Sequence, residues 1–243
     1  GAGQQTCRKL IDDGWIGAPV AATAFMLCHG PESWHPDPEF YYQQGGGPMF
    51  DMGPYYLTAL VNLLGPVRRV TGMTRISFPE RTITSAKKYG TRIQVEVPTL
   101  VTGLIEFESG AIGTIIMAFD VWTHQMPWIE IYGAEGTLRC PDPNTFGGVP
   151  FLKRAGAEEW SAMPLTYGFA ENSRGIGVAD MATALTRGGS FRPQGELAYH
   201  VLDIMQAFHE SAASGKQLDL QSRCNRPEPM PMQQTDYVLR SDK

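Results

Sequence analysis

The chain has 243 residues, of which 42% are hydrophobic and 19% charged, and its formal net charge is −5. A chain of this length buries roughly 70–75% of its unfolded surface, so it can form a core without disulfides or metals. The small negative charge provides no attraction to nucleic acid or to an anionic membrane.

Four scattered cysteines form no Cys-x-x-Cys pair, and no apolar stretch reaches the length that spans a bilayer. We find no pattern of a secretory leader. We therefore expect free thiols and a cytoplasmic protein.

The first fifth of the chain predicts one helix, one strand and one long loop. Residues 4–13 carry apolar side chains at helical spacing and stop at Gly14, which is typical of a short amphipathic helix. The apolar run 19–27 predicts a strand. Residues 28–47 are irregular and rich in aromatic residues, and a loop of that length is usually functional.

A helix over residues 51–64 follows, closed by Gly65 and Pro66. Pro54 is expected in its first turn, where a missing N–H costs no hydrogen bond.

Strand-like patterns then dominate, with two hairpins and a further short pair expected. Their segments are 99–107 with 111–119, 128–132 with 137–140, and 151–160. Helices over 176–185 and 196–213 come next, and the tail beyond residue 220 is rich in proline. Strands in one run between helices predict an α+β fold, with an open, mainly antiparallel sheet and helices packed on one face. We expect one domain over 1–243.

Three glycines at 45–47 precede an acid and a phenol at the start of a helix. Asp51 and Tyr55 are four residues apart, so they share one helix face. Glycine lets a backbone approach another group closely. The pair is therefore a candidate catalytic site for proton transfer with a small substrate. The alternatives are an Asp51 that only caps the helix and a Tyr55 that is a buried aromatic residue.

Five segments, which follow one another along the chain, carry recognisable motifs. They are 1–17, 45–55 (GGG-x-x-x-D-x-G-x-Y), 107–113 (F-x-SGA-x-G), 131–138 (G-x-x-G-x-L) and 196–205. Together they resemble the C-terminal domain of the glucose–fructose oxidoreductase/inositol dehydrogenase (Gfo/Idh/MocA) family. The resemblance covers almost the whole chain. It implies a sheet domain like the C-terminal domain of glyceraldehyde-3-phosphate dehydrogenase. It also implies a catalytic role for Tyr55, because many members carry His at that place, four residues after the same Asp.

The resemblance further implies hydride transfer between NAD or NADP and a sugar, polyol or related carbinol. Family members bind the cofactor in an N-terminal Rossmann domain, and a Glu-Lys-Pro motif supplies an active-site lysine. Neither occurs in this chain, since residues 1–6 and 175–180 only imitate the glycine fingerprint. We expect the substrate-binding and catalytic half of a larger oxidoreductase, inactive and without cofactor alone. The cation that helps Tyr55 is expected from the lysine and the nicotinamide. A non-catalytic binding or structural module is the alternative.

Five further residues are candidates for binding a sugar-like substrate. Trp34, His35 and Tyr41 offer aromatic faces for a sugar ring, or fill a small core under their loop. His124 lies near a strand end and can reach the pocket or a subunit contact. Arg174 can hold a substrate hydroxyl or carboxylate, or remain solvated.

No metal site is predicted, because His29, His35 and Asp37 match no zinc spacing. A metal-dependent hydrolase or isomerase would need ligands there. His200 lies on the apolar side of its helix and is expected to be a satisfied core histidine.

The sheet is also expected to bind a second copy of the chain through its open face. The residues that suggest this are Ile105, Phe107, Ile115, Met117 and Phe119. They offer more apolar surface than one helical layer obviously needs, and an exposed remainder would be an unusual patch.

Overall fold

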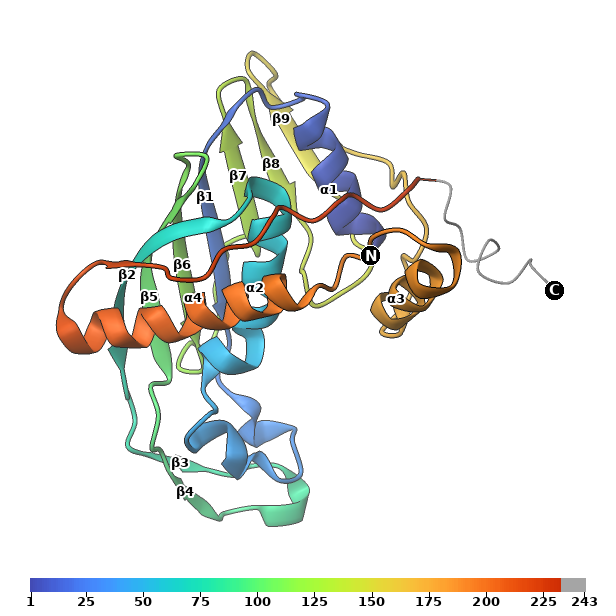
Figure 1. Cartoon of the computed structure of the whole chain (residues 1–243). Helices are drawn as coiled ribbons and strands as arrows, with labels where there is room; N and C mark the ends of the chain where they lie inside the picture. The colour runs from blue at the N-terminus through green and yellow to red at the C-terminus, as the bar shows by residue number, and fades with distance from the viewer. Residues whose placement is uncertain (233–243) are drawn as a thin grey trace.

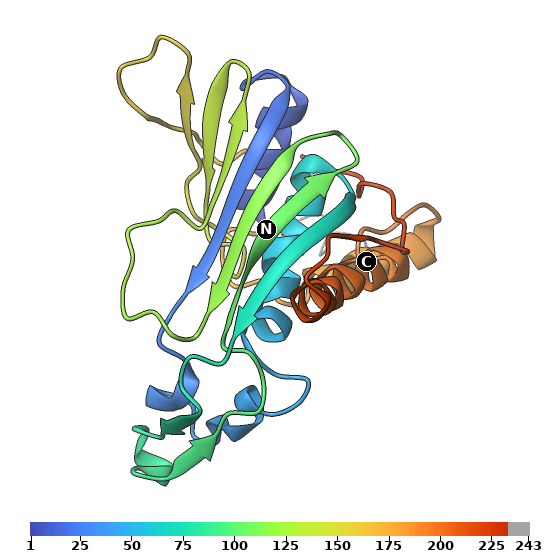
Figure 2. The same ribbon diagram turned by 90° about the vertical axis from the view of Figure 1, so that its left-hand side faces the viewer.

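The computed structural model describes residues 1–232, and one large sheet dominates it (Figures 1 and 2). Its strands are β1 (Pro19–Leu27), β2 (Val67–Arg75), β5 (Leu100–Phe107), β6 (Ile112–Ala118), β7 (Ile129–Gly133), β8 (Gly136–Cys140), β9 (Phe151–Arg154), β10 (Ser161–Ala162) and β11 (Leu218–Asp219). The order across the sheet is β10-β9-β8-β7-β1-β6-β5-β2-β11. Within it, only β1 and β6 pair in parallel, so the expected mainly antiparallel sheet is confirmed.

Helices cover one face of this sheet. They are α1 (Ala2–Asp12), α2 (Pro48–Leu64) and α4 (Gly195–Ser214), while α3 (Ile176–Arg187) lies beside the start of α4. Figure 2 looks onto the opposite face, which no helix of the described residues covers. None of the helices in residues 1–232 is long and apolar enough to cross a membrane.

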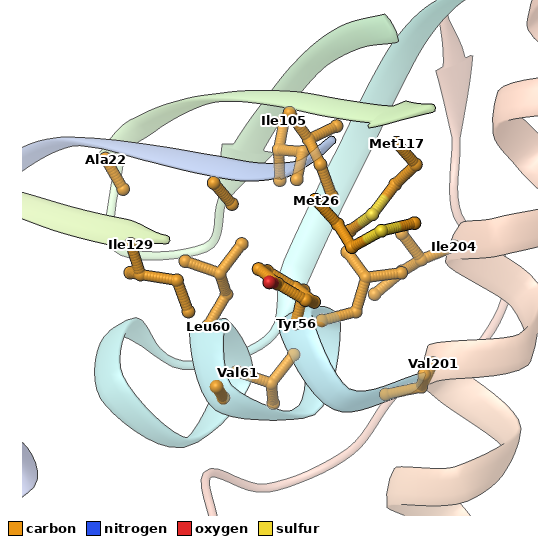
Figure 3. Close-up of a cluster of buried hydrophobic side chains, with 14 of the residues drawn as sticks. Ala22, Met26, Tyr56, Leu60, Val61, Ile105, Met117, Ile129, Val201 and Ile204 are labelled. Atoms are coloured by element: carbon orange, nitrogen blue, oxygen red, sulfur yellow. The ribbon is translucent and has the colours of Figure 1, made fainter. Parts of the chain in front are cut away.

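The hydrophobic core lies between the sheet and α2 and α4. Figure 3 shows Tyr56 and Leu60 of α2 and Ile204 of α4 pointing at sheet residues such as Ile105 and Met117. All five apolar strand residues that suggested a bare outer surface are buried in this core. That argument for a second copy was therefore wrong, because one helical layer is enough to cover them.

His200 of α4 is a satisfied core histidine, as expected. Its Nε2 accepts the Val67 N–H at 2.9 Å, and its Nδ1 lies 2.7 Å from the Ser222 hydroxyl. Burial lowers the pKa of its imidazole.

The helix that carries the candidate site begins one turn earlier than predicted. Gly47, at φ 88°, precedes Pro48, and the Asp51 N–H donates to the Gly47 carbonyl at 3.0 Å. Proline suits a first helical position because its φ is already helical. Pro54 consequently lies inside α2, so its expected place in the first turn was wrong. It leaves the Phe50 carbonyl without a helical N–H donor.

A small extension at one end of the sheet holds the aromatic loop (Figure 1). It consists of β3 (Glu80–Thr82), β4 (Arg92–Gln94) and the 3-10 turns η1 (Pro31–Ser33), η2 (Pro38–Tyr42) and η3 (Ala86–Lys88). Buried Arg81 ties it to the sheet: its guanidinium donates to Glu32 at 2.7 Å and to Asp120 at 3.0 Å. Tyr42 donates a short hydrogen bond to the same Glu32 carboxylate. This network positions the loop against the start of α2.

We expect Gly103→Ala to destabilise the sheet by about 1–3 kcal/mol, the usual cost of overpacking. A Cβ at Gly103 would clash with the Thr71 carbonyl oxygen and lie 2.5 Å from Cε1 of Phe208, so α4 would have to move off β5. Gly195→Ala is the control, because nothing lies within 4 Å of a Cβ there. Urea unfolding of both variants is the measurement. Equal midpoints would contradict the close packing of α4 on β5.

Candidate active site

Two cavities flank the first turns of α2. The Asp51 cavity measures about 190 Å³, and its lining includes Cys28, Trp34, Asp51, Tyr56, Trp128 and Asp142. The Tyr55 cavity measures about 460 Å³, and its lining includes Gln4, Gln5, Tyr55, Asn62 and Arg192. The predicted pair thus faces two neighbouring cavities, one helical turn apart.

Asp51 is a half-buried carboxylate without a protein partner. Because α2 starts at Pro48, Asp51 is not at the N-cap position, and Gly47 occupies it. Within residues 1–232 no hydrogen bond or ion pair reaches the Asp51 carboxylate. Burial raises the pKa of this carboxyl. The capping alternative is therefore wrong, and the group remains available to a ligand.

Tyr55 lies next to a cation that belongs to this chain. Arg174 Nη1 donates to the Tyr55 hydroxyl at 3.2 Å, and its Cζ lies 5.6 Å from the ring centroid. Asn144 Oδ1 accepts from the same guanidinium at 2.9 Å, which orients it. A positive charge beside a phenol oxygen stabilises the phenolate that proton transfer would create. From the sequence, this charge was expected only from the lysine and the nicotinamide, which lie outside the chain. Arg174 was not recognised as a source of it.

The three aromatic candidates form one cluster, and one of them lines the Asp51 cavity. Trp34 is 65% exposed and lines it. His35 and Tyr41 support Trp34 edge-on, at centroid distances of 5.4 and 6.4 Å. His35 Nδ1 also accepts the Asp37 N–H at 3.1 Å, a bond within the loop, and its predicted contact with substrate stays a prediction. Burial raises the pKa of the Tyr41 phenol, and its interactions with Asp51 and Tyr55 raise it further.

His124 approaches the Asp51 cavity through a second tryptophan. Its ring meets Trp128 edge-on at 5.7 Å, and Trp128 lines the cavity. Its Nδ1 is buried without a hydrogen-bond partner among the described residues. Its predicted contact with substrate stays a prediction.

Sequence reasoning missed two polar residues of the Asp51 cavity. Asp142 lies just after β8, between two prolines, and burial raises the pKa of its carboxyl. Tyr56 follows the predicted base directly, and its buried hydroxyl has no partner among the described residues. An acid between two prolines at a strand end is a weak signal. Tyr56 gave no signal, because an aromatic residue at its position on α2 is expected to belong to the hydrophobic core.

The residues considered as metal ligands make contacts with other side chains. Asp37 pairs with Lys87 and Lys88, which lower the pKa of its carboxyl, and His29 stacks on Trp122 at 3.3 Å. In residues 1–232 no group of three or more His, Cys, Asp or Glu side chains could hold a metal ion.

We expect Asp51→Asn to raise the melting temperature near neutral pH by a few degrees. Because burial raises the pKa in the folded state, the charged carboxylate costs stability above that pKa. The gain should shrink as the pH falls through the raised pKa and vanish below the ordinary value of about 3.9. Thermal unfolding between pH 7 and pH 3 measures it, with exposed Asp219→Asn as the unaffected control. A lower melting temperature at pH 7 would mean that Asp51 has a stabilising partner.

The fold of this chain was compared with known proteins. No curated protein sequence matches the chain. Levoglucosan dehydrogenase in complex with NADH and levoglucosan superposes with a TM-score of 0.71 at 21% identity, covering 91% of this chain and 64% of that one. An NAD-binding oxidoreductase from Klebsiella pneumoniae gives 0.70 at 20% identity, covering 90% and 64%. An oxidoreductase domain protein from Kribbella flavida gives 0.67 at 20% identity, covering 91% and 64%.

The chain thus spans about 64% of the length of these structures. Within it, residues 4–139 match the family model of the GFO/IDH/MocA C-terminal domain, and these include most of α1, all of α2, the strands β1 to β7 and most of β8. The chain belongs to the GFO/IDH/MocA C-terminal domain family.

Proposed function

We propose that this chain is the substrate-binding and catalytic half of a nicotinamide-dependent oxidoreductase that acts on a carbinol of a sugar or polyol. The observation that carries the proposal concerns Tyr55: this residue lines a cavity, and its hydroxyl accepts a hydrogen bond from Arg174. The relatives bind NADH, and one is named for levoglucosan, which agrees with this chemistry.

Tyr55 would act as the general base and acid. When a carbinol is oxidised, its carbon loses a hydride and its hydroxyl loses a proton, which the Tyr55 phenolate would accept. Arg174 would stabilise the phenolate and hold the ring in place through its bond to Asn144. Asp51, one turn away in the neighbouring cavity, would hold another hydroxyl of a substrate that spans both cavities. A helical turn rises about 5.4 Å, close to the width of a sugar ring.

A bound nicotinamide would supply the hydride acceptor, and part of the Tyr55 cavity suits it. Gln4 Oε1 is buried there without a partner among the described residues, and it could accept an N–H of a carboxamide. The described residues include no strand, glycine-rich turn and helix in sequence that would bind a pyrophosphate. We therefore propose that another domain binds the rest of the cofactor, and that this chain alone shows no micromolar affinity for NAD(H) or NADP(H). Titration calorimetry on the 243-residue chain tests that point.

The activity test uses the complete protein that contains this chain. NAD⁺ or NADP⁺ and a panel of sugars and polyols are supplied, and formation of the reduced nicotinamide is followed. Turnover that depends on the polyol supports the proposal. Cofactor binding without turnover of any panel member would favour a non-catalytic module.

We also propose that the uncovered sheet face binds a second copy of this chain. Leu104 and Ile112 are 52% and 55% exposed on it, among threonines such as Thr102 and Thr114. Two ion pairs lie on the same face: Arg69 pairs with Glu106, which lies directly opposite Ile112, and Arg139 pairs with Glu130. A face with exposed apolar and threonine side chains, whose charges are already paired, suits a symmetric interface.

We expect Leu104→Lys to convert a dimer into a monomer, because it would place two unpaired charges in that interface. Leu185→Lys is the matched control, since Leu185 is an exposed leucine of α3, away from the sheet face. Sedimentation at micromolar concentration measures both. A wild-type monomer, or a Leu104→Lys dimer, would contradict the proposed interface.

A further inference from the structure

We propose that Asp142 and Tyr56 together hold one hydroxyl of the substrate in the Asp51 cavity, and that the two acids of this cavity select against anionic sugars. This inference rests on the proposed function. It adds two substrate-positioning residues to Asp51 and Tyr55, and it names the substrate class by charge.

The first observation is a cavity with two acids and no base. Asp51 and Asp142 both line it, and its lining includes no Lys, Arg or His. Neither carboxylate forms an ion pair within residues 1–232. Burial raises the pKa of both carboxyls, although the Asn144 N–H, 2.9 Å from Asp142 Oδ1, partly offsets this for Asp142. Both groups therefore have acceptor capacity that the protein does not fill.

The second observation is independent and concerns a donor. Tyr56 is fully buried and lines the same cavity, yet its hydroxyl has no hydrogen-bond partner among the described residues. Buried tyrosine hydroxyls usually find a partner, because an unmade bond costs the full desolvation of the group. After burial itself, the nearby Asp142 and Cys28 are what raise the pKa of this phenol. Tyr56 therefore stays a neutral O–H donor close to the Asp142 carboxylate.

An unfilled donor beside an unfilled acceptor matches a hydroxyl group. A carbinol O–H donates one hydrogen bond and accepts others, so it can donate to Asp142 and accept from Tyr56 at once. A carboxylate or phosphate would be repelled by two acids. Trp34 and Trp128 line the same cavity and offer flat apolar faces to the C–H bonds of a sugar ring.

The test measures binding of three probes to the complete protein by titration calorimetry: levoglucosan, glucose and glucuronate. We expect the two neutral probes to bind and glucuronate, an anionic analogue of glucose, to bind more weakly, because two unpaired carboxylates repel it. Asp142→Asn and Tyr56→Phe should each weaken binding of the neutral probes about tenfold or more, since each leaves a buried polar group unpaired. The double variant should lose less than the product of the two, because both residues act on one hydroxyl. Surface variants Asp219→Asn and Tyr199→Phe are the controls.

Two further readouts separate positioning from structure and from chemistry. Tyr56→Phe should leave the melting temperature unchanged or higher, because the hydroxyl loses no protein partner. In turnover assays, Asp142→Asn and Tyr56→Phe should raise KM with kcat within a few-fold, whereas loss of the base lowers kcat. A protein that binds the neutral probes as expected but turns none over would refute the proposed function alone.

Three results would overturn the inference itself. They are unchanged binding of the neutral probes by both variants, tighter binding of glucuronate than of glucose, and no binding of either neutral probe by the wild type. A marked fall in the melting temperature of Tyr56→Phe would also count against it, because the hydroxyl would then have a partner within the protein.

Discussion

Tyr55→Phe is expected to lower kcat by about 10²–10⁴-fold in the complete oxidoreductase, with KM changed only a few-fold. The substitution keeps the ring that lines the Tyr55 cavity and faces Arg174, and removes only the hydroxyl that Arg174 contacts. If no base takes the hydroxyl proton, hydride loss produces a high-energy protonated carbonyl, unless water accepts the proton. Binding depends on other groups, so it should be largely preserved.

Steady-state kinetics with the best carbinol of the activity panel measures the effect. Tyr199→Phe makes the same chemical change on an exposed tyrosine of α4 and should leave kcat unchanged. Arg174→Gln should lower kcat in the same direction but less, because it weakens the stabilisation of the phenolate and keeps the base. A Tyr55→Phe enzyme within a few-fold of wild type would mean that another group transfers the proton.

Arg81→Met is expected to reduce the free energy of unfolding by about 3–5 kcal/mol, the range seen when one partner of a buried ion pair is removed. The Arg81, Glu32 and Asp120 side chains are only 4%, 6% and 7% exposed. Arg81 also donates to the Phe119 carbonyl at 2.9 Å. Its loss would leave two buried carboxylates without a counter-charge and release the extension that holds the aromatic loop.

Urea unfolding followed by circular dichroism gives the free energy. Arg92→Met is the matched control, because Arg92 pairs with Glu80 at the surface, 72% exposed, and such pairs contribute at most about 1 kcal/mol. Adding Glu32→Gln to Arg81→Met should recover part of the loss, since it removes one of the stranded charges. Similar midpoints for Arg81→Met and Arg92→Met would show that the network contributes little.

Local signals were enough to predict most of the sheet. The strand 19–27 and the hairpin of β5 and β6 follow from apolar runs separated by turn residues. The final helix follows from its apolar stripe, and Gly215, at φ 66°, ends it as expected. These features depend on residues a few positions apart, so the sequence alone contains the information. The start of α2 was misjudged because Pro48, not Asp51, begins the helix.

For the site, the sequence by itself determined one helix: Asp51 and Tyr55 at its start, behind a glycine run. Only the tertiary structure decided what surrounds them. Arg174 reaches Tyr55 across 119 positions of sequence, and Asp142 arrives from the loop after β8 to share a cavity with Asp51. No local propensity encodes such contacts. They arise because strand pairing and packing of α2 on the sheet bring distant loops to one end of a helix, where burial then leaves carboxylates and a phenol without protein partners.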